Sequence, residues 1–207
     1  MMPVSPRPRL LVLASTYPRW ANDHEPSFVH DLAKRLADRF EVVVLCPHAP
    51  GAASRELLDG VQIVRYRYAP ASLERLVNDG GIVTNLRRHP WMLVLLPGFL
   101  FGQLLALARL VRRSPPAVIH AHWIIPQAFI AALAGALGLH SSPILVTSHG
   151  ADLYALRGWL LRKLKQWTLR RCTRATVVSA AMLEPLQALG MPPARTSVAP
   201  MGVDRSE

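Results

Sequence analysis

Polar and glycine residues interrupt an apolar run at residues 144–156, "ILVTSHGADLYAL", without a turn dipeptide before the break. A connection between two elements needs Gly, Asn or Pro, but it does not need a histidine beside a glycine. His149 can donate a hydrogen bond to a hydroxyl group or accept one near neutral pH, and Gly150 lets a ligand approach the backbone closely. Asp152 either binds a ligand hydroxyl or caps the following helix, and the sequence leaves both roles open.

Three histidines raise the possibility of a metal site. His120 and His122 form an H-x-H pair on a predicted strand, so both rings point to the same side. His149 on a neighbouring strand could complete a zinc site of the kind found in metal-dependent hydrolases. Asp152 is the one nearby carboxylate, however, and hydrolytic sites commonly use more. We therefore expect no bound metal and a structural role for His120, and keep a metal-dependent hydrolase as an alternative.

Apolar runs alternate with helical periodicity along most of the chain, and this order predicts the fold. Short buried strands are indicated at 10–14, 41–46, 61–68, 117–123, 143–148, 175–179 and 196–200, with helices between most of them. Such alternation favours an α/β fold, a Rossmann-like doubly wound parallel sheet of about seven strands with helices on both faces. Residues 47–60 are expected to form an irregular surface connection. We expect one domain over residues 1–200.

The predicted topology gathers polar residues at one edge, because ligands of open parallel sheets bind outside the carboxyl ends of the strands. The connection at residues 15–25 is longer than the usual 2–6 residues, which is typical of a functional loop. The helix that begins at Pro26-Ser27 offers free N–H groups to an anion such as a phosphate. The residues expected to line this cleft are Ser15, Thr16, Tyr17, Glu25, Ser27, His122, Trp123, Gly150, Asp152 and Ser179.

Two absent motifs narrow the chemistry. The chain has neither a phosphate-binding Walker loop nor a G-x-G-x-x-G after the first predicted strand. A dinucleotide-dependent oxidoreductase is therefore not expected, despite the fold. No recognised nucleic-acid-binding motif is present, so nucleic acid is not an expected partner.

The chain is basic and poor in cysteine. Its 207 residues carry a formal net charge of +11, which favours an anionic partner. Only two cysteines are present, and they have no metal-ligand spacing, so a reducing, cytoplasmic compartment is the simpler expectation.

A predicted helix near residues 157–171 concentrates this charge. No acidic residue lies between Asp152 and Glu184, whereas seven basic residues do. On a helical wheel Leu160, Leu164 and Trp167 share one side. The residues predicted to face away from it, towards an acidic membrane surface, are Trp159, Arg162, Lys163, Lys165 and Arg170. A solvated face on a soluble helix is the alternative.

Residues 90–108 run for 19 residues without a charge, close to the ~20 that span a bilayer. Pro97-Gly98 interrupts this stretch, and three arginines follow it. One helix packed on a sheet from Phe99 onward explains the same residues. We expect that buried or membrane-touching helix, with a transmembrane span as the alternative.

Several segments in this order resemble the N-terminal domain of family 4 glycosyltransferases. They are "STYPRW…EPSFVHDLAKRLADRFEVVVLCP", "VIHAHWIIPQAFIAAL", "VTSHGADLYAL", "ATVVSAAM" and "VAPMGVD". The resemblance implies a GT-B fold, in which two Rossmann-like domains face each other across a cleft. It also implies transfer of a sugar from a nucleotide diphosphate donor, with retention at the anomeric carbon and without a bound metal or other cofactor.

The resemblance also implies roles for individual residues. This half would hold the acceptor, a glycan or a lipid-linked sugar, and His149 would be the catalytic residue beside the reacting sugar. The loop 16–27 would approach the donor phosphates, although Glu25-Pro26-Ser27 stand where the family commonly carries a glycine. Ser179 would line the same cleft.

The chain ends shortly after the residues that resemble the start of the interdomain hinge, Met201, Gly202 and Asp204. We expect the donor domain, with its nucleotide-sugar site, to be missing, so that residues 201–207 begin the hinge and the chain is half of a hexosyltransferase that needs its other domain or subunit. The expected product is a polysaccharide or glycolipid, made in the cytoplasm or at the inner face of the membrane. A non-catalytic domain that binds a glycan or a lipid-linked sugar is the alternative.

Overall fold

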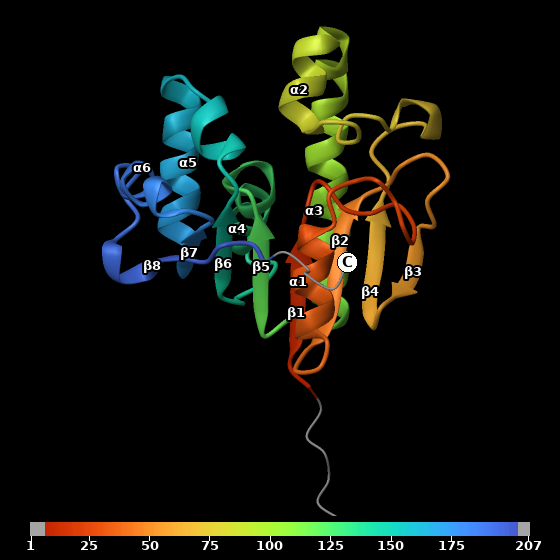
Figure 1. Cartoon of the computed structure of the whole chain (residues 1–207), viewed down its shortest axis with the longest axis horizontal. Coiled ribbons are helices and arrows are strands. Elements are labelled where there is room, and N and C mark those ends of the chain that lie inside the picture. Colours follow the sequence, from red (N-terminus) through yellow and green to blue (C-terminus); the bar gives the residue numbers. More distant parts are fainter. Residues whose placement is uncertain (1–6, 203–207) are drawn as a thin grey trace, which may run out of the picture.

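The computed structural model describes residues 7–202, which form one sheet between two layers of helices (Figure 1). The sheet has eight strands in the order β3-β4-β2-β1-β5-β6-β7-β8, and every neighbouring pair is parallel except β3 and β4. This confirms the predicted doubly wound fold. The strands are β1 (Arg9–Leu13), β2 (Glu41–Pro47), β3 (Arg55–Leu58), β4 (Val61–Tyr66), β5 (Val118–His122), β6 (Ile144–Ser148), β7 (Arg174–Val177) and β8 (Thr196–Val198).

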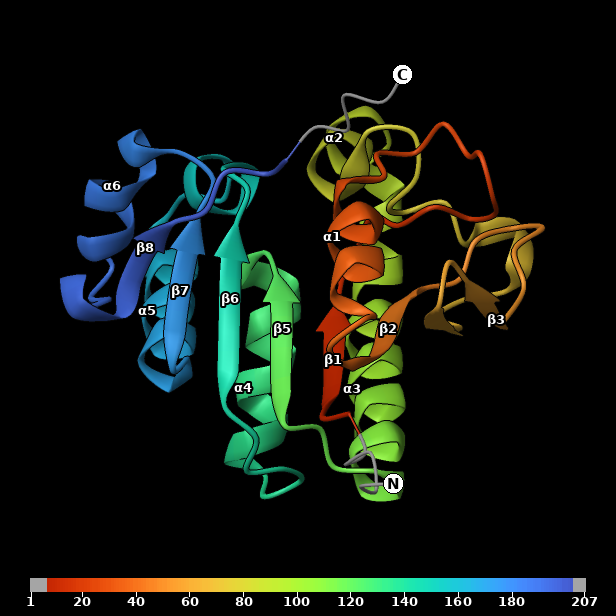
Figure 2. The same ribbon diagram turned by 60° about the horizontal axis from the view of Figure 1, so that its bottom comes forward.

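The helices divide unequally between the two faces of the sheet (Figure 2). One face is covered by α1 (Phe28–Leu36), whose Val29 and Ala33 pack against alternate residues of β1 and β2. The other face carries a larger core, which four helices cover. These are α3 (Leu96–Arg113), α4 (Phe129–Ala136), α5 (Trp159–Arg171) and α6 (Leu183–Gln187); α2 (Gly81–Arg88) precedes α3.

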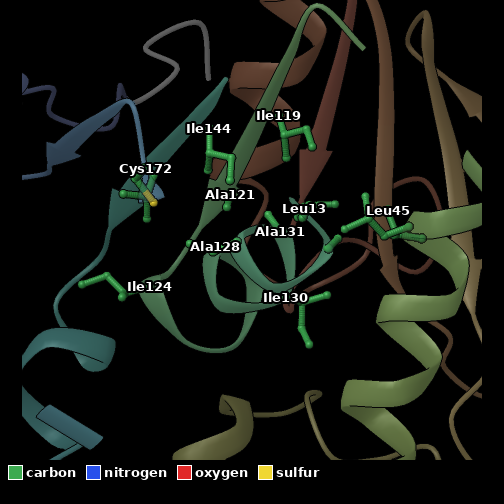
Figure 3. Packing of buried hydrophobic residues seen from close by; sticks show 14 of the residues in the cluster. Leu13, Leu45, Ile119, Ala121, Ile124, Ala128, Ile130, Ala131, Ile144 and Cys172 are labelled. Atoms are coloured by element: carbon green, nitrogen blue, oxygen red, sulfur yellow. The ribbon is translucent and has the colours of Figure 1, made fainter. Parts of the chain in front are cut away.

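The larger core is built from the residues of the strands that face α3 and α4. Leu13, Leu45 and Ile119 are fully buried there, and Figure 3 shows them in the same cluster as Ala128 and Ala131. The two alanines are also fully buried. Small side chains on this helical segment let it pack closely on β5, which holds the end of β5 in place.

The expectation of an irregular connection at residues 47–60 was wrong in part. Arg55–Leu58 form β3, which pairs antiparallel with β4, so the sheet has eight strands and not seven. Asp59 and Gly60 join the two strands with φ of 49° and 78°. Two residues at positive φ form the turn that matches the twist of a hairpin, and Asp-Gly is a preferred sequence for it.

The apolar segment at 90–113 forms a short helical turn, Pro90–Leu95, followed by α3, with Pro97 in the first turn of that helix. Phe99, Leu107 and Val111 are buried against the sheet, as expected for a packed helix. By length and composition, Pro90–Arg113 could also cross a membrane, and 33% of its most apolar stretch is buried within the protein.

Two glycines set the distance between α3 and the chain that follows β4. A Cβ atom added at Gly98 would lie 2.5 Å from the Tyr68 carbonyl oxygen, and one at Gly102 would lie 2.7 Å from that of Arg67. Both obstacles are backbone atoms, so neither can move aside without shifting an element. The close approach therefore requires glycine at both positions.

We predict that Gly98→Ala lowers the free energy of unfolding by about 1–3 kcal/mol, because the new methyl group forces α3 away from the sheet. Urea denaturation followed by circular dichroism measures this. Gly135→Ala in α4 is the matched control, since its Cβ would meet its nearest atoms at 3.5 Å. That change should be neutral or slightly stabilising, and an equal loss in both variants would contradict the prediction.

Candidate functional site

A cavity of about 320 Å³ opens at the carboxyl ends of the strands. It lies at the topological switch point, where β2 and β5 flank β1 on opposite sides, which is where open α/β sheets bind their ligands. Polar wall residues come from the segments after β1 and β6 and from α2, namely Ser15, Thr16, Glu25, Asp152 and Thr84. The apolar wall is formed by Phe28, Ile82, Val83, Trp123, Ile125, Pro126 and Leu156.

Glu25 is the acidic residue that the first loop contributes to the cavity. It is 5% exposed, and its Oε1 accepts a hydrogen bond of 2.7 Å from the backbone N–H of Asp79. Gly80 and Gly81 follow at φ of 123° and 82°, so the backbone turns sharply beside Glu25 and starts α2. An ionised carboxylate accepts hydrogen bonds only, so Glu25 is suited to bind the hydroxyl groups of a ligand.

Two residues of the first loop that were expected in the cleft, Tyr17 and Ser27, do not line the cavity. Tyr17 is buried beneath the first loop, with its hydroxyl 2.7 Å from Nδ1 of His30, and it does not line the cavity. Ser27 directly precedes α1 and donates a hydrogen bond of 2.7 Å from its hydroxyl to Oδ2 of Asp31.

Asp152 joins two loops instead of capping a helix. Its Oδ2 accepts a hydrogen bond of 2.7 Å from the N–H of Ile124, and its Oδ1 accepts one of 2.9 Å from the hydroxyl of Ser148. Gly158, and not Asp152, precedes α5. The carboxylate therefore fixes Trp123, which adopts a φ of 78°, at the end of β5. For a bulky residue, positive φ is strained, and such strain clusters at functional sites.

His149 is paired with His122. Its Nε2 lies 2.9 Å from Nδ1 of His122, the two rings stack at 18°, and the rings of Phe28 and Trp123 each lie 4.9 Å from it. His149 is partly buried behind these two rings, which themselves line the cavity. Gly150 follows at a φ of 99°. His149 therefore contacts two rings of the cavity wall, but neither His149 nor the predicted cleft residues His122 and Gly150 line the cavity themselves.

Burial keeps these histidines neutral. It lowers the pKa of His149 and of His120 to about 4, and that of His122 well below its ordinary value. Nε2 of His120 lies 2.8 Å from Oγ1 of Thr147. Each of the three rings therefore directs one nitrogen at a neighbouring ring or at Thr147, while Nε2 of His122 is buried without a hydrogen-bond partner among the described residues. The three histidines do not form a group whose ligand atoms converge on one point, as a metal site requires. Within residues 7–202, the group of three potential metal-ligand side chains whose ligand atoms all lie within 4.8 Å of one another is His24, Glu25 and Asp79.

The prediction that Lys165 faces outward was wrong. Its side chain is buried, and Nζ donates hydrogen bonds to the carbonyl oxygens of Asp152, Leu153 and Leu156 at 3.3, 3.0 and 2.9 Å. Buried carbonyls of an irregular turn need donors, and a helical wheel cannot show them. Leu160, assigned to the packed side, is 70% exposed. The remaining predicted outward residues, Trp159, Arg162, Lys163 and Arg170, are exposed.

The last predicted residues lie away from the cavity. Ser179 is exposed, two residues after the end of β7, and does not line the cavity. Met201 and Gly202 line a separate cavity of about 400 Å³, between α1 and the side of the sheet that carries His120 and Thr147. Asp204 lies outside the described residues.

Sequence analysis missed the contribution of α2, which supplies Gly81, Ile82, Val83 and Thr84 to the cavity wall. The sequence Asn78-Asp79-Gly80-Gly81 marks a sharp turn before this helix and could have identified it. Nothing local, however, indicates that this turn meets the segments after β1 and β5.

Comparison with known proteins identifies the family. Residues 27–207 match the family described as Glycosyltransferase Family 4. The chain belongs to this family. No curated protein matches the chain at a significant level.

The family 4 chain also shares its fold with solved structures of low sequence identity. One is a structure of sucrose-phosphate synthase from Thermosynechococcus elongatus, with a TM-score of 0.63 and 13% identity over 95% of this chain and 90% of the other. Another is Alr3699/HepE from Anabaena in complex with UDP and glucose, with a TM-score of 0.59 and 14% identity over 96% of this chain and 45% of the other. A third is UGT73P12 from Glycyrrhiza uralensis, complexed with glycyrrhetinic acid 3-O-monoglucuronide. Its TM-score is 0.57, with 16% identity over 95% of this chain and 49% of the other. The chain spans about half the length of the last two.

We predict that the family 4 domain loses stability as the pH falls from about 6.5 towards about 4. In the unfolded chain each histidine takes up a proton near its ordinary pKa of about 6.5, whereas the folded state resists protonation until about pH 4. The unfolded state therefore binds more protons in this window, and each such histidine costs about 1.4 kcal/mol per pH unit. Urea unfolding at several pH values between about 7.5 and about 5 measures this.

His120→Gln provides the control, because glutamine can still hydrogen-bond to Thr147 but does not titrate. The carboxylates titrate in both proteins, so their effect on the free energy of unfolding cancels when the variant is compared with the wild type. A wild type and variant whose stabilities fall in parallel over this window would show that folding does not lower the pKa of His120.

Proposed function

We propose that this domain is the acceptor-binding half of a retaining glycosyltransferase. The enzyme transfers a sugar from a nucleotide diphosphate donor to a glycan or a lipid-linked acceptor. One observation carries the proposal: in a chain of family 4, the cavity at the switch point combines a buried carboxylate with extended apolar walls. Sugars are bound in this way, with hydroxyl groups on a carboxylate and the apolar faces of the rings on aromatic side chains.

Four residues at or beside the cavity have a role in this proposal. Glu25 accepts hydrogen bonds from acceptor hydroxyl groups, while Trp123 and Phe28 offer ring faces to the sugar. His149 acts as a neutral imidazole beside the reacting sugar, held in orientation by His122. Nδ1 of His149 makes no hydrogen bond within residues 7–202, so this atom is available to a substrate hydroxyl.

The donor site belongs to a second domain in this proposal. Solved structures of similar fold include complexes of Anabaena Alr3699/HepE with UDP and with UDP-glucose, and this chain spans less than half of that protein. We infer a uridine or related nucleotide sugar as donor, bound mainly outside this chain. Cys46 and Cys172 are both free and buried, which supports a cytoplasmic location.

Sugar transfer by the complete gene product that contains this chain tests the proposal. We expect a labelled sugar to pass from one of a panel of nucleotide sugars to an extracted glycan or lipid fraction. Glu25→Gln should lower kcat/KM by about 10–100-fold, because the substitution removes the charge that binds the acceptor hydroxyls. His149→Ala should lower kcat by a similar factor while circular dichroism shows an unchanged fold.

His89→Ala is the matched control for His149→Ala, because His89 is exposed and lies outside the cavity. Its kinetic constants should equal those of the wild type. Acceptor binding without any transfer, seen by isothermal calorimetry, would instead identify a non-catalytic glycan-binding domain. Full activity of His149→Ala would remove that residue from the mechanism.

A further inference from the structure

The positive charge of the protein comes from one part of the chain. Residues 80–183 contain 12 of the 24 lysines and arginines but a single acidic residue, Asp152, whereas basic and acidic residues balance in the remainder. The whole net charge of +11 therefore belongs to this segment. It comprises α2, α3, α4 and α5 with the strands between them, and Asp152 is buried. The helical layer opposite α1 thus exposes basic residues with no acidic residue from this segment beside them.

Large apolar side chains are exposed within the same segment. The turn between α2 and α3 presents Trp91, Leu93 and Val94, which are 52%, 56% and 73% exposed and which we call the crest. Phe101 (65%) and Leu105 continue this surface four residues apart on the outer side of α3. Single exposed apolar residues are ordinary, but five large ones within residues 91–105 favour an interaction surface.

A second exposed apolar pair lies across the cavity from α2. Trp159 and Leu160, at the start of α5, are 74% and 70% exposed. Residues 81–84 of α2 line one wall of the cavity and residues 151–156, just before α5, line another. Both α2 and the start of α5 lie at the end of the molecule towards which the strands point (Figures 1 and 2).

Basic side chains adjoin both apolar groups. Arg87 and Arg88 are exposed in the last turn of α2, just before the helical turn Pro90–Leu95 that carries the crest. Arg157, Arg162 and Lys163 are exposed around Trp159. Tryptophan and aliphatic residues flanked by arginine and lysine match the layered chemistry of a bilayer surface, with acyl chains below anionic headgroups.

We propose that this edge of the domain docks on an anionic lipid bilayer. The crest and the Trp159-Leu160 pair enter the boundary between headgroups and acyl chains, and the adjoining arginines and Lys163 contact lipid phosphates. In this proposal α3 does not cross the bilayer, because Phe99, Leu107 and Val111 are buried against the sheet and Gly98 and Gly102 lie close to the backbone after β4. The cavity then opens between two membrane contacts, where a lipid-linked acceptor can enter from the membrane.

Vesicle binding tests this docking without any sugar chemistry, so its outcome is independent of the proposed function. The full chain is sedimented with phosphatidylcholine vesicles and with vesicles in which about one lipid in three is phosphatidylglycerol. We expect binding to the anionic vesicles that is at least about tenfold stronger and that weakens with salt. Quenching of tryptophan fluorescence by brominated acyl chains should show insertion.

The double variant L93E/V94E should lose at least about tenfold of this binding, because two carboxylates oppose both burial and the anionic surface. Leu57→Glu is the matched control: Leu57 is also 70% exposed, but it lies on β3 at the far edge of the sheet. It should bind vesicles as the wild type does. Unchanged circular dichroism of L93E/V94E confirms its fold.

Three outcomes would overturn the proposal. The first is failure of the wild type to bind anionic vesicles, and the second is equal binding by L93E/V94E and the wild type. The third is a lipid-free dimer, seen by analytical ultracentrifugation, that L93E/V94E converts to monomer, since the crest would then be a contact between two copies of the chain.

Discussion

A carboxylate buried at the end of a strand needs hydrogen-bond donors, and Asp152 takes them from two different segments. Its oxygens accept from the N–H of Ile124, after β5, and from the hydroxyl of Ser148, at the end of β6. Lys165 of α5 then satisfies the carbonyls of the turn that contains Asp152. Burial raises the pKa of this carboxyl group, and the hydrogen bonds oppose that shift. Two strand ends, a turn and a helix are thereby fixed around one wall of the cavity.

The same arrangement explains the properties of the site. With the segment after β5 held by Asp152, Trp123 keeps a positive φ and presents its ring beside those of Phe28 and His149. These rings exclude water from the histidine pair, which keeps His122 and His149 neutral. A neutral imidazole can both donate and accept a hydrogen bond. The cavity therefore combines polar groups of fixed orientation with apolar surface, as recognition of an amphiphilic sugar ligand requires.

The two helical layers of the fold differ in their charge and in their exposed apolar side chains. The layer with α1 belongs to the part of the chain in which charges balance, whereas the layer with α2 to α5 carries the entire net charge and most of the exposed large apolar residues. Electrostatic attraction acts over about a Debye length, near 10 Å at moderate salt, so this polarity can orient the protein before contact. The membrane docking and the sugar transfer proposed for the domain would then use the same edge of the sheet.

The amino-acid sequence by itself determined the fold class, the order of the parallel strands along the chain and the edge at which polar residues gather, because these depend on local periodicity and on strand direction. The Asp59-Gly60 turn before β4 is likewise a local signal for a hairpin. Only the tertiary structure decided which side chains meet. Lys165 and Asp152 look like ordinary outward and capping residues until distant carbonyls and N–H groups are placed beside them. Likewise, α2 reaches the cavity only because the chain folds back over the switch point, a contact that no local pattern encodes.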